Sequence, residues 1–146
     1  MYSILVTVHS YIRWLVLVSL IYAIYRACKG WLNNTPFSNA NNTIRQITVT
    51  VAQVQLVIGI WLYTVSPVTQ YFLHHLREAM HQRRSRFFGM EHITMMIIAV
   101  TIITIGSSLA KLQSSDRLKF KTIATWFSLG LLIILMAIPW KFSPLV

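Results

Sequence analysis

The chain has 146 residues, of which 55% are hydrophobic and only 11% are charged, and its formal charge is +10. Several long apolar runs separate its 13 Lys and Arg residues, so the composition predicts an integral membrane protein and argues against a nucleic-acid-binding protein, which would gather its cations into one stripe. The single cysteine, Cys28, excludes an intrachain disulfide.

Four apolar segments predict transmembrane helices, since each approaches the 20 residues or so that cross a bilayer. The expected spans are residues 4–25, 47–65, 87–109 and 122–138, and their ends carry Trp, Tyr, Lys and Arg, as is typical of membrane interfaces. No basic leader precedes the first segment, so we expect it to remain in the protein as a span. Short connections favour an all-α four-helix transmembrane bundle, with residues 1–146 forming a single integral membrane domain.

The segment between the second and third spans has its own pattern. Residues 69–88 read TQYFLHHLREAMHQRRSRFF, in which apolar side chains recur at helical spacing and polar ones gather mostly on the other side. The apolar positions are Phe72, Leu73, Leu76 and Met80. This pattern predicts one amphipathic helix lying in the membrane interface.

The distribution of Lys and Arg predicts the orientation of the chain. Seven lie in the loops after the first and third spans, and five lie in the middle segment and the C-terminal tail, on the other side. Because cytoplasmic loops carry the excess of positive charge, we expect both termini outside.

Two histidines occupy matching positions in the first and third spans. His9 is five residues after Ile4, and His92 is five residues after Phe87. At 1.5 Å of rise per residue, both lie about 7–8 Å inside their helices. These spans run in the same direction and are diagonal neighbours in a simple bundle, so the two side chains approach the same membrane face. Polar residues inside a span indicate a functional site.

A pair of imidazoles from facing helices is how helical bundles hold b-type haem. His9 and His92 are the candidate ligands of the haem iron, with Met96 or Met95 as the substitute if the pair is His and Met. Arg13 lies one helical turn after His9, where its guanidinium would pair with a haem propionate. Arg83, Arg84 and Arg86 lie just outside the same end, where they would help to neutralise the second propionate.

Other interpretations of these residues stay open. A histidine alone is more often an interhelical hydrogen-bonding residue, and Arg13 has Glu91 as a candidate ion-pair partner. In a quinone-binding protein, one of the span histidines would bond a quinone carbonyl and Glu91 would pass a proton. His74 and His75 are rival ligands. A further alternative is a haem-free accessory subunit of a larger membrane complex.

Three motifs resemble a known family. HSYIRW at residues 9–14, RFFGMEH at 86–92 and IPWKFSP at 138–144 resemble small four-helix bacterial membrane proteins commonly labelled cytochrome b, and the resemblance covers nearly the whole chain. It implies a b-type haem and a place near respiratory electron transfer in the inner (cytoplasmic) membrane.

We therefore predict a multi-pass, one-electron carrier with one bis-His haem near the outer face and both termini in the periplasm. Its expected partners are the lipid bilayer and other respiratory subunits, with association of two copies left open.

Overall fold

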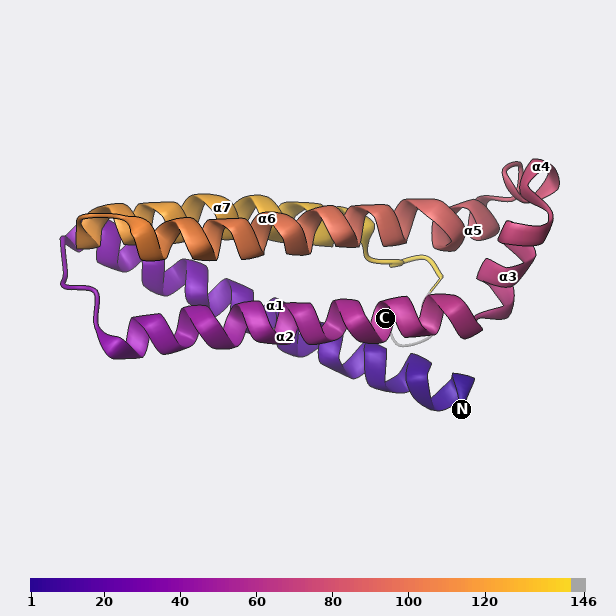
Figure 1. The fold of residues 1–146 in the computed structure, drawn as a ribbon, viewed down its shortest axis with the longest axis horizontal. Coiled ribbons are helices and arrows are strands. Elements are labelled where there is room, and N and C mark those ends of the chain that lie inside the picture. The colour runs from indigo at the N-terminus through magenta and orange to yellow at the C-terminus, as the bar shows by residue number, and fades with distance from the viewer. Residues whose placement is uncertain (143–146) are drawn as a thin grey trace.

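The computed structural model describes residues 1–142, and every regular element in that range is a helix (Figure 1). The long helices are α1 (Tyr2–Asn33), α2 (Asn39–Val65), α6 (His92–Leu112) and α7 (Asp116–Ala137). All four are long and apolar enough to cross a membrane, α6 together with the helical turns that precede it from Arg83. The predicted all-α four-helix bundle is confirmed. The last two residues of the IPWKFSP motif lie outside the described range.

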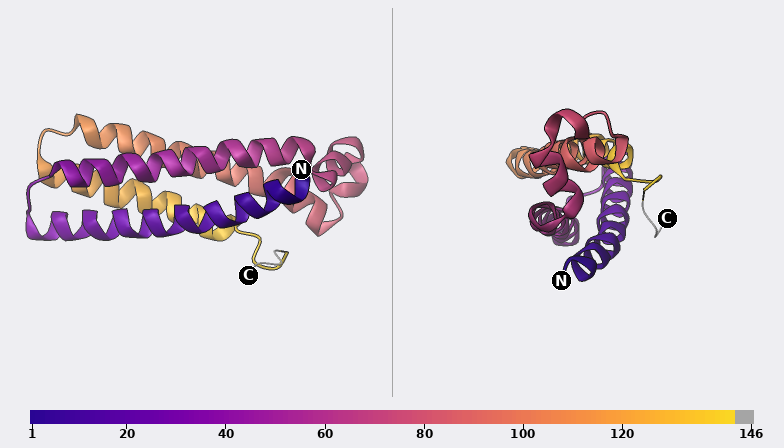
Figure 2. Two further views of the ribbon diagram at one scale, coloured as in Figure 1. Left: turned by 90° about the horizontal axis from the view of Figure 1, so that it is seen from below. Right: turned by 90° about the vertical axis from the view of Figure 1, so that its right-hand side faces the viewer.

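The four helices form a ring in which α1 and α6 are diagonal. Helix α1 packs against α2 and α7, and α6 packs against the same two helices. The connections 34–38 and 113–115 lie at one end, here called the loop end, as Figures 1 and 2 show. The N-terminus and residues 66–86 lie at the other, here called the histidine end, where α1 diverges from α6 and α7 (Figure 1). The chain therefore runs up, down, up and down, as predicted.

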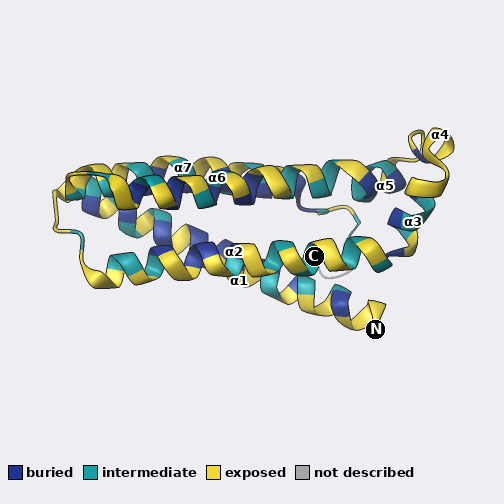
Figure 3. Ribbon diagram, in the orientation of Figure 1, coloured by how far each residue is buried: buried dark blue, intermediate teal, exposed yellow. Residues whose placement is uncertain are grey.

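The core of the bundle is apolar and closely packed. Its fully buried side chains include Leu20, Ile103, Phe120 and Phe127. Large apolar side chains also cover the outside of the long helices, where Figure 3 shows extensive exposed surface. An apolar exterior is the surface that lipid chains require.

Each long helix reaches beyond the span expected from hydropathy. The 32 residues of α1 measure about 48 Å, whereas the hydrocarbon core of a bilayer is about 30 Å thick. Asn34 ends α1 in the left-handed region at φ 50°. Ser38 and Ser115 begin α2 and α7 as N-caps, and each side chain accepts a hydrogen bond from a backbone N–H three residues later. Polar residues at the membrane surface thus continue the helices.

The middle segment departs from the prediction of one amphipathic helix. It forms three short helices: α3 (Pro67–His74), α4 (Leu76–Ala79) and α5 (Arg83–Arg86). The helical path is broken at His75, with φ −132° and ψ 49°, and at Gln82, with φ −92° and ψ 111°. A straight helix over residues 67–86 would be about 30 Å long, too long to join the adjacent ends of α2 and α6.

Gly106 allows close packing of α6 on α7, because a Cβ at this position would overlap the side chain of Trp126. We expect Gly106→Leu to lower the free energy of unfolding in detergent by about 1–3 kcal/mol through overpacking. The measurement is the midpoint of thermal unfolding. Ser108→Leu is the control, since Ser108 is exposed on the same helix. A Gly106 variant as stable as the Ser108 variant would contradict this packing.

Candidate functional site

His9 and His92 meet across the diagonal of the bundle. Their ring centroids are 6.4 Å apart and the ring planes are inclined by 74°. One comes from α1 and the other from the first turn of α6, and both are half-buried. The equal offsets in the sequence thus correspond to a real juxtaposition at the histidine end.

The ring of His92 is oriented by the end of α7. Its Nδ1 lies 2.7 Å from the carbonyl oxygen of Ala137, the last residue of that helix. A carbonyl oxygen only accepts, so Nδ1 carries the proton, and in the neutral imidazole Nε2 keeps its lone pair. Histidines that bind a metal through one nitrogen commonly donate the other N–H to a carbonyl in this way.

Helix α2 passes close to His9. Gln55 donates to the backbone oxygen of His9 at 2.8 Å, which joins α2 to α1 beside the histidine. At Gly59, a Cβ would lie 3.1 Å from Cε1 of the His9 ring, so the absence of a side chain there leaves room for the imidazole. His9 Nδ1 is buried and has no hydrogen-bond partner within residues 1–142.

A π-helical segment, η1 (Phe87–Glu91), leads directly into His92. Tyr63 donates from its hydroxyl to the backbone oxygen of Gly89 at 2.9 Å, tying this segment to α2. The rings of Phe87 and Phe88 lie 5.7 and 6.3 Å from that of His92, between centroids. Isolated π-helical turns are frequent at functional sites.

Arg13 is the buried cation of the site. Its side chain is one turn from His9 on α1 and only 9% exposed, and its guanidinium lies 5.4 Å from the ring of Trp14. Nε and Nη2 have no hydrogen-bond partner in the described part of the chain. A buried charge without a counter-ion is strongly unfavourable, so this group fits a site that binds an anion.

Glu91 does not neutralise Arg13. Its Oε1 lies 2.8 Å from Nε of Arg86, and both side chains are close to 40% exposed. Arg86 also donates to the backbone oxygen of Met80 at 3.2 Å. Met96, the substitute ligand, lies one turn after His92 and packs partly buried against the core. The structure therefore brings together the two histidines and Arg13, while Arg86 and Glu91 form a separate pair.

The donor set fits haem better than a bare metal ion. Residues 1–142 hold no group of three or more His, Cys, Asp or Glu side chains that would enclose an ion. Haem iron needs only two axial ligands from the protein. His9 and His92, with ring centroids 6.4 Å apart, are the residues that would hold such a group.

Two residues that shape this site were not predicted from the sequence. Ala137 acts through its backbone oxygen, which any residue would have, so its type gives no indication of this role. Gly59 acts through the lack of a side chain. An isolated glycine within an apolar helix often marks a close approach of another group, and this was the one indication that the sequence offered.

No family model, curated protein or solved structure matches the chain.

Tyr63→Phe removes the hydroxyl that holds the π-helical segment against α2. We expect it to lower the free energy of unfolding by about 1 kcal/mol and to speed amide hydrogen exchange at residues 87–91. Tyr11→Phe is the control, because the Tyr11 side chain is exposed on the same half of the bundle. Unchanged exchange at residues 87–91 would show that this hydrogen bond does not hold the segment.

Proposed function

We propose that the protein is a membrane b-type cytochrome in which His9 and His92 are the axial ligands of one haem at the histidine end. The observation that carries this proposal is the histidine pair, with rings 6.4 Å apart and His92 oriented by the Ala137 carbonyl. The resemblance of the HSYIRW and RFFGMEH motifs to the cytochrome b family supports the same function.

The surrounding residues have definite roles in this proposal. Ala137 holds the proton on Nδ1 of His92, which would leave the Nε2 lone pair free to bind haem iron. Arg13 would donate to a propionate, which gives its buried guanidinium the counter-ion that it lacks. Gly59 leaves space on the α2 side of His9. When bound, the haem supplies a centre that accepts and gives up one electron.

The position of the site sets what the protein can do. A single haem near one membrane face does not carry electrons through the whole bilayer, so the donor and acceptor must be reached from that face. The histidine end also exposes Arg77, Arg83 and Arg84, which would steer an acidic partner toward the site. We therefore propose a relay within a respiratory assembly of the bacterial inner membrane. The excess of Lys and Arg at the loop end supports periplasmic termini.

The first test is the reduced-minus-oxidised absorption spectrum of protein purified from haem-supplied cells, with the haem content quantified. The expected result is a b-type spectrum with about one haem per chain, lost in both His9→Ala and His92→Ala because each removes one of two iron ligands. His74→Ala and His75→Ala are matched controls that should keep the haem, since both side chains are exposed on the middle segment.

Two outcomes would overturn this assignment. Loss of haem in the His74 or His75 variant would move the ligand to the middle segment. A folded wild-type protein without haem would favour the other candidates, and quinone binding that requires His9 or His92 would then identify a quinone site. Co-purification with larger membrane subunits would instead identify an accessory subunit.

Arg13→Met separates haem binding from folding. Without haem, the variant should be more stable than the wild type, because it replaces an unpaired buried charge with an apolar side chain. Haem retention should fall about 10- to 100-fold, since a charge-assisted hydrogen bond to a propionate is lost. Haem retention is measured by transfer to a haem acceptor, and stability by thermal unfolding of the haem-free protein.

Arg26→Met is the control for the loss of a positive charge on the same helix. Arg26 lies toward the loop end and donates to Asn41 at 2.9 Å, so its replacement should leave haem retention unchanged. Equal haem retention in the Arg13 variant and the wild type would show that Arg13 does not bind a propionate.

A further inference from the structure

The loop end holds a cavity of about 260 Å³ whose walls are polar and basic. It is formed by the start of α2, the end of α6 and the start of α7. Its polar lining residues are Ser38, Asn39, Asn42, Arg45, Lys111 and Lys119. The set contains three cations and no carboxylate, so the cavity is suited to an anion.

Arg45 is the buried cation of this cavity. Its side chain is 4% exposed, although Arg45 is only two turns into α2. Nε and Nη2 donate to Oδ1 of Asn42 at 3.2 and 2.7 Å, and Nη1 donates to the backbone oxygen and hydroxyl of Ser107. All of these acceptors are neutral, and one Nη2 hydrogen remains for another acceptor.

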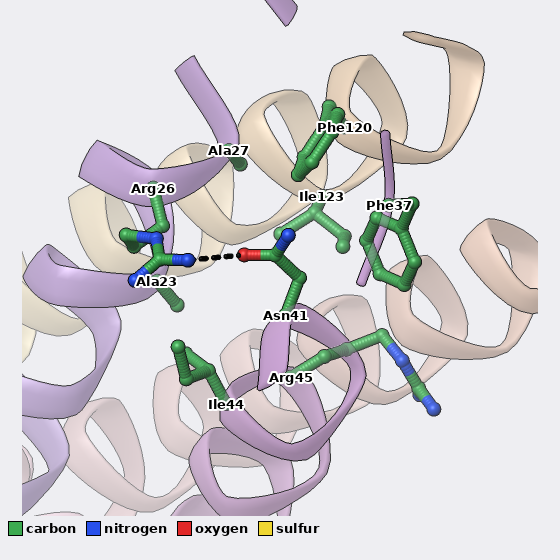
Figure 4. Close-up of a pocket in the computed structure, with 9 residues that line it drawn as sticks. All are labelled: Ala23, Arg26, Ala27, Phe37, Asn41, Ile44, Arg45, Phe120 and Ile123. Atoms are coloured by element: carbon green, nitrogen blue, oxygen red, sulfur yellow. Dashed lines mark hydrogen bonds between the residues drawn. The ribbon is translucent and has the colours of Figure 1, made fainter. Parts of the chain in front are cut away.

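No carboxylate neutralises Arg45 within residues 1–142. The ion pairs in that range join Arg86 to Glu91 and Lys119 to Asp116, the latter at 3.9 Å. A second, much smaller cavity of about 10 Å³ borders Arg45 and the Arg26–Asn41 hydrogen bond (Figure 4). It has room for about one water molecule. Figure 4 also shows the Arg45 guanidinium turned away from that hydrogen bond, so an anion would reach Arg45 from the larger cavity.

Two further features favour a phosphate group in the larger cavity. Ser38 and Asn39 place the N-terminus of the 27-residue α2 at its wall, where free backbone N–H groups and the helix dipole attract anions. Lys111 is exposed and Lys119 half-buried at the rim, and together with Arg45 they line the open cavity from three helices. Clustered Lys and Arg at a helix N-terminus form an arrangement suited to phosphate.

The location of the cavity points to a lipid as the source of the phosphate. It lies at the ends of membrane-crossing helices, Phe37 forms part of its wall, and Leu112 beside it is 80% exposed. A headgroup in the cavity would therefore leave its acyl chains against an apolar surface. We propose that this cavity binds the headgroup of an anionic phospholipid, with Arg45, Lys111 and Lys119 contacting the phosphate. This proposal is independent of haem binding.

The test is native mass spectrometry of the full chain in detergent, titrated with phosphatidylglycerol and, separately, with phosphatidylcholine. The wild type should bind phosphatidylglycerol selectively at one site. Lys111→Gln/Lys119→Gln should weaken this binding about 30-fold, because each Lys near an anionic lipid contributes about fivefold. Asp116→Asn should strengthen it, since the carboxylate next to Lys119 is removed.

Arg117→Gln/Lys121→Gln is the matched control. Both residues are exposed at the same end of the bundle but do not line the cavity, so binding should change less than about threefold for a site confined to the cavity. Equal weakening by the two double variants would overturn the proposal in favour of diffuse surface charge. Displacement of the lipid by inorganic phosphate at the same concentration as the lipid would also overturn it, and would assign the cavity to free phosphate.

Discussion

Two arginines are buried in apolar helices, one toward each end of the bundle, and each needs hydrogen-bond acceptors or an anion. Both ends of the bundle depend on this requirement. Arg13 and Arg45 lie within α1 and α2, and neither has a carboxylate partner within residues 1–142. A guanidinium remains protonated in a protein, so it must find acceptors or an anion when water is removed. Each of the two proposed sites would supply an anion to a buried guanidinium, because a haem propionate and a lipid phosphate are both negatively charged.

The two arginines differ in what the chain itself supplies. Asn42 lies three residues before Arg45 on the same helix, and Ser107 faces it from α6, so neutral acceptors partly satisfy the guanidinium. For Arg13, Nε and Nη2 have no hydrogen-bond partner within residues 1–142, and the guanidinium lies 5.4 Å from the ring of Trp14. The carboxylate that sequence reasoning offered to Arg13 is held by Arg86, because Arg86 and Glu91 are five residues apart and one π-helical turn aligns such positions.

Hydropathy predicted the number and order of the spans because lipid requires long apolar helices. It did not predict their ends, since helices continue past the bilayer wherever capping and packing support them. Residues 39–46 illustrate this: an Asn-rich stretch suggests a loop, yet the Ser38 cap starts α2 there. The breaks at His75 and Gln82 also escaped prediction, because the distance between the ends of α2 and α6, rather than the local pattern, requires the chain to turn.

The second span was expected to start at residue 47, whereas α2 starts at Asn39. This difference explains why the sequence places Arg45 in a loop and the structure places it in a helix. In the sequence, Arg45 falls in the loop after the first expected span, where it is one of the seven Lys and Arg residues that predict the orientation of the chain. Because α2 begins at Asn39, Arg45 instead lies on the second turn and faces Ser107 of α6 inside the bundle. The histidine pair was predictable because both residues lie near the same end of parallel spans, although α1 begins at Tyr2 and α6 at His92, so their offsets from the helix starts are not equal. A buried cation is not predictable in this way, since its burial depends on where the helix begins.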